Sequence, residues 1–310
     1  MERSLTALVR KFLENLEVER NCSKLTVRNY GHYLNELIKF LTSSGVRVPS
    51  VDDINLETVR SWRLFLSRKP GTDGSLKTVT QGYYVIALRS FLKWLIKNDI
   101  GAMQPEKLDV PKSKEHSLKF LNKEQVERLL NQPLLSSKTG LRDKAILELL
   151  FSSGLRVSEL ANLNRDQIDL KVREFGVVGK GGRARVVFIS KRSAEFLDRY
   201  LRSRLDRYKP LFIRMSGGFR VSATDKEMRL TVRSIQRLIK KYARQARLPV
   251  AATPHTLRHS MATDLLRSGA DLRSVQEILG HKNIATTQIY THITDARLRE
   301  VHEKYHSGNR

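Results

Sequence analysis

Apolar residues recur at helical spacing through most of this chain, and this periodicity constrains its fold more than any other feature. In the first hundred residues it marks four segments, at 4–19, 23–45, 55–69 and 75–99. Each segment opens with Ser or Asn, residues that cap a helix by accepting a hydrogen bond from its first turn. Residues 1–104 are therefore predicted to form an N-terminal domain of four helices.

A polar segment follows the fourth helix and is predicted to separate two domains. Residues 105–117 contain Pro105, Pro111 and several charges, without apolar periodicity, which is typical of a linker. Asn122 then precedes an apolar run, and Gln125 stands three residues later, which is the pattern of a capping box. A second domain is predicted over residues 118–310.

The second domain is predicted to be mainly helical with a small β component, which makes the fold class α+β. A helix stops at Gly154, and another begins near Ser158 after a tight turn. Two β-prone runs flank a Gly-Gly turn in residues 173–190 and predict a hairpin. A glycine pair within residues 210–224 could turn a second hairpin.

The charge of the chain points to a polyanionic partner. Lys and Arg number 57 against 32 Asp and Glu, a formal net charge of +25. Residues 1–112 carry 18 basic and 12 acidic side chains, whereas residues 113–310 carry 39 and 20. Ribosome-associated proteins and basic membrane-surface proteins share this property, so charge alone does not single out DNA.

The cysteine content and the apolar runs indicate a cytoplasmic protein. Cys22 is the only cysteine, which excludes an intramolecular disulfide and a cysteine-based zinc site. The first twenty residues are charged throughout, and no apolar run in the sequence reaches the length of a membrane span. We expect neither a signal peptide nor a membrane anchor.

One predicted helix, residues 229–247, carries a one-sided basic face. At about 100° per residue, its basic side chains fall within an arc of roughly 120°. They are Arg229, Arg233, Arg237, Lys240, Lys241, Arg244 and Arg247. A solvated helix face is the ordinary explanation, but like charges at this spacing repel each other, and a phosphate backbone would offset the repulsion. We expect this face to contact DNA or RNA.

The stretch 251–292 combines basic and imidazole side chains with a tyrosine. Pro254 suits the first turn of a helix over residues 253–269, which places His255 and Arg258 on one face. A further helix over residues 271–280 ends at a glycine.

Two more residues of this stretch complete the set. His281 follows the glycine at the helix end, and Tyr290 comes nine residues after His281. Taken singly, each of the four residues has an ordinary structural explanation, such as a surface arginine or a packed tyrosine. Their combination carries the functional hypothesis.

Two further candidates lie upstream of this stretch. Arg156 stands at a turn that opens a helix, where outward-pointing backbone N–H groups favour an anion. Lys180 lies beside the glycines of the predicted hairpin turn, where a ligand backbone can approach closely. A plain turn lysine is the simpler explanation of Lys180 alone.

Four segments, taken in order, resemble the tyrosine recombinase family, and within it the Xer-type chromosome-dimer resolvases. They are GLRVSEL, GKGGRARV, HTLRH and LGHKNIATTQIYTH. The resemblance covers nearly the whole chain and implies an N-terminal SAM-like core-binding domain, a linker and a catalytic domain. Phe188 departs from the pattern, because many relatives have proline at this position.

The resemblance also implies a role for each candidate. Tyr290 would attack a DNA phosphate and form a 3′-phosphotyrosyl bond, with Arg156 and Arg258 holding the phosphate. Lys180 would protonate the leaving 5′-oxygen. His255 and His281 would hydrogen-bond the phosphate, and His255 would also accept the phenol proton. No metal or other cofactor is expected. Glu159 could hold Arg156 or cap a helix.

The family resemblance further implies partners. We expect double-stranded DNA with short inverted-repeat arms, and a homo- or hetero-tetramer with a related recombinase on two DNA sites. A motor-protein activator is a further candidate. A tail helix from about residue 295 would dock into a neighbouring protomer, or alternatively fold back onto its own domain.

Several functional alternatives stay open from the sequence. Recombination could serve chromosome-dimer resolution or the integration and excision of a mobile element. A type IB topoisomerase would share the chemistry without exchanging partner strands, and a non-catalytic DNA-binding protein could have kept the fold.

Overall fold

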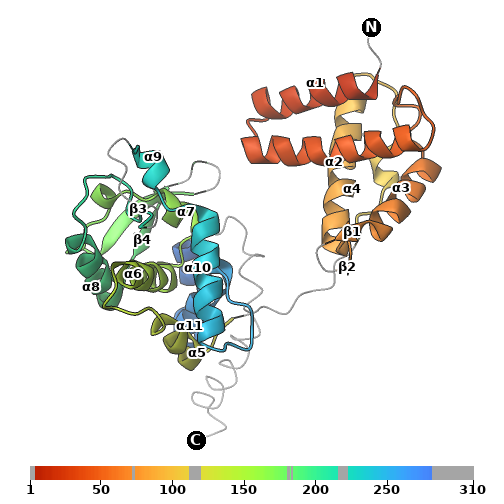
Figure 1. Ribbon diagram of the computed structural model, residues 1–310. Coiled ribbons are helices and arrows are strands. Elements are labelled where there is room, and N and C mark those ends of the chain that lie inside the picture. Colours follow the sequence, from red (N-terminus) through yellow and green to blue (C-terminus); the bar gives the residue numbers. More distant parts are fainter. Residues whose placement is uncertain are drawn as a thin grey trace, which may run out of the picture. The chain divides into compact units, whose positions relative to one another are not determined.

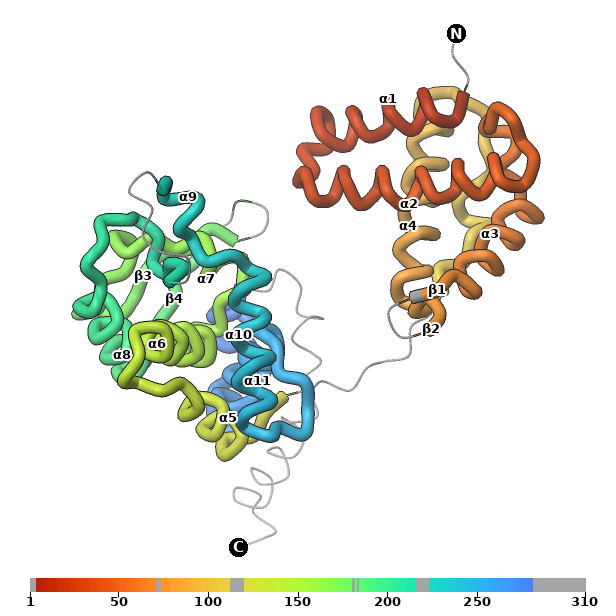
Figure 2. The backbone as a smooth tube through the Cα atoms, in the orientation of Figure 1, coloured from red at the N-terminus to blue at the C-terminus, as the bar shows by residue number. Residues whose placement is uncertain are grey.

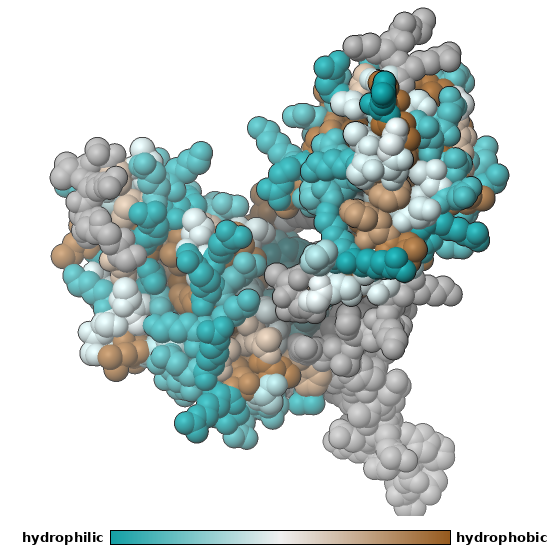
Figure 3. Space-filling model, turned by 45° about the vertical axis from the view of Figure 1, so that its right-hand side comes forward, coloured by the Kyte–Doolittle hydropathy of each residue, from teal (hydrophilic) through white to brown (hydrophobic). Residues whose placement is uncertain are grey.

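The chain divides into two compact units, Met1–His116 and Ser117–Arg310 (Figure 1). This computed structural model describes residues 4–71, 74–111, 120–179, 182, 184–215 and 223–280. Each unit has its own hydrophobic core, so we describe each separately. Figure 3 shows hydrophilic residues over much of the visible face of both. Among the described helices, none combines the length and apolar character needed to cross a membrane.

The N-terminal unit is built on four helices, as predicted. They are α1 (Leu5–Val18), α2 (Lys24–Ser43), α3 (Leu56–Arg68) and α4 (Thr78–Lys97). The side chains of Ser4, Ser23 and Asn55 cap the first three helices by accepting first-turn N–H groups. The expected Ser cap of the fourth helix is wrong, because α4 begins after Lys77 without a side-chain cap.

A small ladder explains this difference at α4. Strand β1 (Pro70–Gly71) pairs antiparallel with β2 (Gly74–Ser75), and Ser75 lies opposite Pro70. Ser75 is therefore part of a strand, two residues before the helix cap.

Aromatic side chains fill the N-terminal core. Phe12 from α1 meets Phe91 from α4 edge to face, with ring centroids 5.4 Å apart, and Trp62 is fully buried. The segment predicted to be a linker contributes to this core as well. Pro105 opens the short 3-10 helix η1 (Pro105–Lys107), and both Pro105 and Leu108 are buried against the unit. The apolar residues of this stretch therefore pack as part of the N-terminal unit.

The C-terminal unit is mainly helical with one hairpin. Its helices are α5 (Lys123–Leu130), α6 (Lys138–Ser153), α7 (Val157–Asn162), η2 (Arg165–Gln167), α8 (Lys191–Arg202), α9 (Asp225–Met228), α10 (Val232–Gln245), α11 (Pro254–Arg267) and α12 (Leu272–Leu279). The capping box of Asn122 and Gln125 is present as predicted. The fold class is confirmed: mainly α with a small antiparallel β component.

The predicted hairpin is confirmed as two antiparallel strands, β3 (Glu174–Val178) and β4 (Ala184–Phe188). Val177 lies opposite Arg185 in the register. The second hairpin suggested for residues 210–224 falls partly outside the described residues. Within the described part of that segment, Pro210 and Ile213 form isolated bridges to Asn164 and Arg229.

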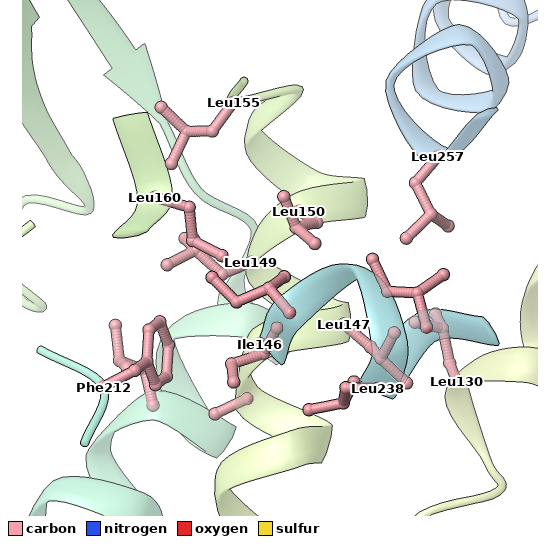
Figure 4. Close-up of a cluster of buried hydrophobic side chains, with 14 of the residues drawn as sticks. Leu130, Ile146, Leu147, Leu149, Leu150, Leu155, Leu160, Phe212, Leu238 and Leu257 are labelled. Carbon is pink, nitrogen blue, oxygen red and sulfur yellow. The ribbon is translucent and has the colours of Figure 1, made fainter. Parts of the chain in front are cut away.

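Helix α6 runs through the middle of the C-terminal core. Figure 4 shows Ile146, Leu149 and Leu150 of α6 among leucines from other elements, including Leu238 of α10 and Leu257 of α11. Because every residue of α6 from Asp143 to Leu150 is buried, this helix forms the centre against which the surrounding helices pack.

Two glycines in left-handed conformations end α6 and α12 close to one another. Gly154 caps α6 with φ of 58°, and Gly280 caps α12 with φ of 65°. A Cβ atom on Gly154 would lie 3.2 Å from Leu279 Cδ2 and 3.3 Å from Met261 Sδ. The C-terminal ends of α6 and α12 are thus packed together, and both helices contact α11. Figure 2 traces α6 and α11 within this unit.

Candidate functional site

Arg156 lies at the first turn of α7, where it was predicted. Its backbone N–H donates to Glu159 Oε2 at 2.9 Å, and its Nη1 donates to Glu159 Oε1 at 2.9 Å. Its Nη2 lies 3.5 Å from the carbonyl oxygen of Gly280. The side chain is 29 % exposed, so one part of the guanidinium is held by the protein while another part faces solvent.

Arg258 is buried at the junction of three helices. It belongs to α11 and is only 4 % exposed. Its Nη1 donates to the carbonyl oxygen of Gly154, and its Nη2 donates to that of Leu279 at 2.6 Å. These carbonyls belong to the C-terminal ends of α6 and α12, which carry partial negative charge. The two helix ends therefore stabilise a buried cation.

Arg156 and Arg258 donate hydrogen bonds to two adjacent backbone carbonyl groups. Arg258 donates to Leu279, and Arg156 donates to Gly280, which is the next residue along the chain. The structure thus brings together two guanidinium groups from α7 and α11, as the sequence predicted. Guanidinium groups stay charged at any working pH and match the geometry of phosphate oxygens. A pair of them can bind and polarise a phosphodiester.

His255 lies one helical turn before Arg258 on α11, where part of its surface is open to solvent and part is covered by the protein. Partial burial lowers the pKa of His255, and the positive charges of Arg258 and Arg156 lower it further. The imidazole is therefore neutral at neutral pH and can accept a proton. The pKa of the neighbouring His259 is also lowered, chiefly by burial.

Glu159 and Arg185 form a further part of the site, of which the sequence analysis predicted Glu159 but not Arg185. Glu159 both holds Arg156 and caps α7, so it fills the two roles considered for it. Arg185 of β4 was missed. Its Nη1 and Nη2 donate to Glu159 Oε1 and Oε2 at 2.9 and 2.8 Å.

A sequence signal for Arg185 did exist. On a strand, Arg185 shares a face with Val187, which is buried against the core, and a charge on an inward face requires a partner. Burial on its own would raise the pKa of Glu159, but hydrogen bonds from Arg185 and Arg156 outweigh it and lower that pKa to about 2.

Three predicted site residues, Lys180, His281 and Tyr290, lie outside the described residues. In the sequence, Lys180 falls between β3 and β4, and His281 directly follows Gly280. Among the residues that the structure does describe, no group of three or more His, Cys, Asp or Glu side chains could hold a metal ion.

The basic helix begins later than predicted, and this changes the position of Arg229. Helix α10 spans Val232–Gln245 with Thr231 as its cap, so the expected start at Arg229 is wrong. Arg229 Nη1 donates to the carbonyl oxygens of Ala161 and Leu163 at 3.1 and 3.0 Å. Its Nη2 donates to Asn164 Oδ1 at 2.6 Å. The Arg229 guanidinium is therefore bound to other parts of the protein, whereas the basic side chains on α10 itself are exposed.

The other expected contact residues share one exposed face of α10. They are Arg233, Arg237, Lys240, Lys241 and Arg244. Within the described residues, none of these five takes part in a salt bridge. The opposite face packs into the core, and Tyr242 donates its hydroxyl to Asp143 Oδ2 at 2.9 Å. The helix is thus anchored on one side and positively charged on the other.

A basic recess adjoins the N-terminal half of α10. It measures about 710 Å³, and its lining includes Arg214, Arg237 and Lys241 together with the hydroxyl groups of Thr231 and Ser234. The acidic residue in its wall, Asp143, already accepts hydrogen bonds from Arg142 and Tyr242. The recess therefore presents net positive charge and hydroxyl donors, a combination that suits a phosphate group.

Comparisons with known proteins show the family of this chain. Residues 119–297 match the phage integrase family, and residues 9–99 match the phage integrase N-terminal SAM-like domain. The chain is 34% identical to tyrosine recombinase XerD of Listeria innocua over 305 residues, covering 96% of this chain and 98% of the relative. It is 35% identical to tyrosine recombinase XerC of Actinobacillus succinogenes over 307 residues, covering 96% of each.

A solved structure shows the same fold. The XerH site-specific recombinase, bound to a palindromic difH substrate in a post-cleavage complex, has a TM-score of 0.70 at 22% identity. The match covers 95% of this chain and 83% of that one. The paired arginines, the family matches and the Xer relatives agree, and this chain belongs to the phage integrase family of tyrosine recombinases.

Proposed function

We propose that this protein is a site-specific DNA recombinase that cuts and rejoins strands through a covalent 3′-phosphotyrosyl intermediate. The observation that carries the proposal is the convergence of Arg156 and Arg258 on the carbonyls of Gly280 and Leu279. Two fixed guanidinium groups can neutralise the charge that develops on the nonbridging oxygens of a phosphate under attack.

The proposed cleavage step balances without an external energy source. The Tyr290 hydroxyl oxygen attacks phosphorus, a tyrosyl–phosphate bond forms, and the bond to the 5′-oxygen breaks. The 5′-oxygen leaves as a hydroxyl. The tyrosyl phosphodiester conserves the free energy of the DNA phosphodiester that was broken. The 5′-hydroxyl of a partner strand can therefore attack it, reverse the step and complete strand exchange.

Proton transfer in this proposal falls to the remaining site residues. The neutral imidazole of His255, favoured by its lowered pKa, accepts the phenol proton of Tyr290. Lys180 donates the proton to the leaving 5′-oxygen, and His281 donates a hydrogen bond to the phosphate. The proposed reaction uses no metal or other cofactor.

The basic face of α10 is the proposed DNA contact of the catalytic unit. Arg233, Lys240 and Arg244 lie on its exposed face, and Arg237 and Lys241 of the same face also line the adjoining recess. Since these cations lack salt bridges within the described part of the chain, DNA phosphates would supply the missing negative charge.

The proposed partners follow from the relatives. The XerH structure contains a palindromic substrate, and we propose a duplex with short inverted-repeat arms for this chain as well. Four protomers, of one kind or of two related recombinases, would hold two such sites, with a motor protein as a candidate activator. Chromosome-dimer resolution and mobile-element integration or excision are the two proposed settings. We propose that this reaction takes place in the cytoplasm.

A capture experiment tests the proposal and identifies the target sequence at the same time. Nicked duplexes with randomised centres are incubated with the protein in EDTA, quenched in detergent and sequenced from the covalently attached fraction. We expect a defined site to be enriched with the wild type and not with Tyr290→Phe. DNA binding without any covalent fraction would contradict the enzyme proposal.

A second assay separates recombination from topoisomerase activity. Two copies of the enriched site are placed on one supercoiled plasmid, and products are resolved by size. Deletion or inversion of the intervening segment supports strand exchange between partners. Relaxation of the plasmid without rearranged products would instead indicate a type IB topoisomerase.

A further inference from the structure

We propose that Arg185 is a positioning residue that keeps the positive charge of Arg156 available for phosphate. This inference deepens the proposed function and rests on it, because it concerns how Arg156 acts on a DNA phosphate. Arg185 lies on β4, in a different element from Arg156, and the two guanidinium groups meet through one carboxylate, that of Glu159.

The hydrogen bonds around Glu159 define this arrangement. The Glu159 carboxylate is 5 % exposed and accepts four N–H groups, two on each oxygen. Two come from the Arg185 guanidinium in a bidentate fork, and two come from the backbone and Nη1 of Arg156. A carboxylate offers about four acceptor sites, so those of Glu159 are filled.

The unequal sharing of Glu159 has a consequence for Arg156. Arg185 faces the carboxylate with two guanidinium N–H groups, whereas the Arg156 guanidinium uses Nη1 alone. Nη2 of Arg156 approaches the Gly280 carbonyl at 3.5 Å. The guanidinium N–H groups that are not used in these contacts with Glu159 and Gly280 have no hydrogen-bond partner within the described residues. They remain available for phosphate oxygens.

Charge balance makes Arg185 necessary for this role. Arg156 and Glu159 alone would form a neutral pair, which attracts a phosphate only weakly. Arg185 neutralises Glu159, so that the group of three carries a net charge of +1. In a nearly buried setting this extra charge matters more than it would in water, because screening is weak.

Close packing fixes Arg185 in its place. Its side chain is 11 % exposed, and its Cδ atom lies where a Cβ atom on Gly280 would come within 2.7 Å. The aliphatic stem of Arg185 therefore rests on the backbone of Gly280, the residue whose carbonyl faces Arg156. Arg185 touches both residues that hold Arg156.

A charge-neutralisation experiment tests this proposal. Cleavage of a saturating nicked duplex is measured in single turnover for the wild type, Arg185→Gln, Glu159→Gln and the double variant. Arg185→Gln is expected to slow cleavage by about 10- to 100-fold, less than the loss of a preorganised donor that touches the phosphate directly, because Arg185 acts through Arg156. The double variant is expected to recover at least about fivefold, because a neutral amide at position 159 no longer cancels the charge of Arg156.

The controls distinguish this role from a structural one. Arg192→Gln removes another arginine that pairs with carboxylates, those of Glu127 and Glu148, and is expected to leave the cleavage rate unchanged. Arg185→Lys keeps the charge and tests whether charge alone suffices if Arg185→Gln fails to fold. A double variant as slow as Arg185→Gln, with equal thermal stability, would overturn the proposal.

A binding measurement separates failure of this inference from failure of the proposed function. Inorganic phosphate is titrated against the protein while the His255 ring resonances are followed by NMR. We expect Arg185→Gln to weaken phosphate binding and the double variant to restore it, whether or not the protein cleaves DNA. Unchanged phosphate affinity in Arg185→Gln overturns the inference. Absence of a DNA adduct with normal phosphate behaviour counts against the recombinase proposal alone.

Discussion

Arg156 and Arg258 donate hydrogen bonds to neighbouring carbonyl oxygens, those of Gly280 and Leu279, at the C-terminal end of α12. The two arginines come from different helices, so the end of α12 sets the distance between them. Any change that moves this helix end is expected to move the two guanidinium groups that we propose to bind one phosphate. The left-handed cap at Gly280 is thus part of the site and not merely a helix stop.

The two arginines are expected to differ in their structural importance. Arg258→Met leaves two buried carbonyls without their donor and is expected to lower the free energy of unfolding by about 2–4 kcal/mol. Arg156→Gln affects a partly exposed side chain and is expected to cost about 1 kcal/mol or less. Both variants are expected to abolish cleavage. Urea unfolding of the two proteins measures the difference, and equal destabilisation would contradict the described burial of Arg258.

The charges around His255 predict its titration behaviour. Partial burial and the positive charges of Arg258 and Arg156 lower its pKa below the ordinary 6.5. Cleavage that needs a neutral imidazole should therefore persist below pH 6.5 and fall only near the lowered pKa. Arg156→Gln removes one positive charge and is expected to raise the pKa of His255. NMR titration of the ring measures both values, and an unchanged pKa in the variant would place His255 away from Arg156.

Glu159 predicts a specific loss of stability in acid. Its pKa falls from an ordinary 4.5 to about 2 on folding, so its contribution is present above pH 4.5 and is lost as pH falls towards 2. Relative to Glu159→Gln, the wild type should lose stability across this range. Thermal unfolding between pH 5 and pH 2 tests the difference. Parallel curves for the two proteins would mean that Glu159 does not hold its arginines as described.

The α10 surface predicts a change in the salt dependence of DNA binding. Neutralising Lys240 or Arg244 is expected to reduce the steepness of log affinity against log salt by about 1 in each variant, which corresponds to the loss of one phosphate contact. Arg229→Gln is the matched control, because its guanidinium bonds to Ala161, Leu163 and Asn164. It should lower stability and leave the slope unchanged. Equal slopes for all three variants would exclude α10 as a phosphate-contacting face.

Local patterns predicted much of the fold correctly. The caps at Ser4, Ser23, Asn55 and Asn122, and the glycine stop after α6, follow from interactions within one or two turns, which neighbouring residues determine. The start of α10 was misplaced because Arg229 continues the apparent basic stripe. Its long-range bonds to the α7 region, which periodicity does not reveal, hold it outside the helix instead.

The functional site was predictable only as a set of residue types. The order of Arg156, His255 and Arg258 in the sequence suggested one centre. The ends of α6 and α12 accept hydrogen bonds from the two arginines, and His255 lies one turn before Arg258 on α11. Strand alternation places Arg185 on an inward face beside Val187, but it does not predict Glu159 as the partner. This pairing depends on the contact between β4 and α7, a tertiary arrangement that a local pattern does not encode.

The most direct test of the account identifies the residue that becomes linked to DNA. The covalent fraction captured on nicked duplexes is digested with trypsin and nuclease and then sequenced by tandem mass spectrometry. We expect a 3′-nucleotide phosphate on Tyr290, within the tryptic peptide of residues 283–297. Loss of this adduct in Tyr290→Phe and Arg156→Gln would support the proposed chemistry. An adduct on Tyr305 or another residue, or tight DNA binding with no adduct at all, would contradict it.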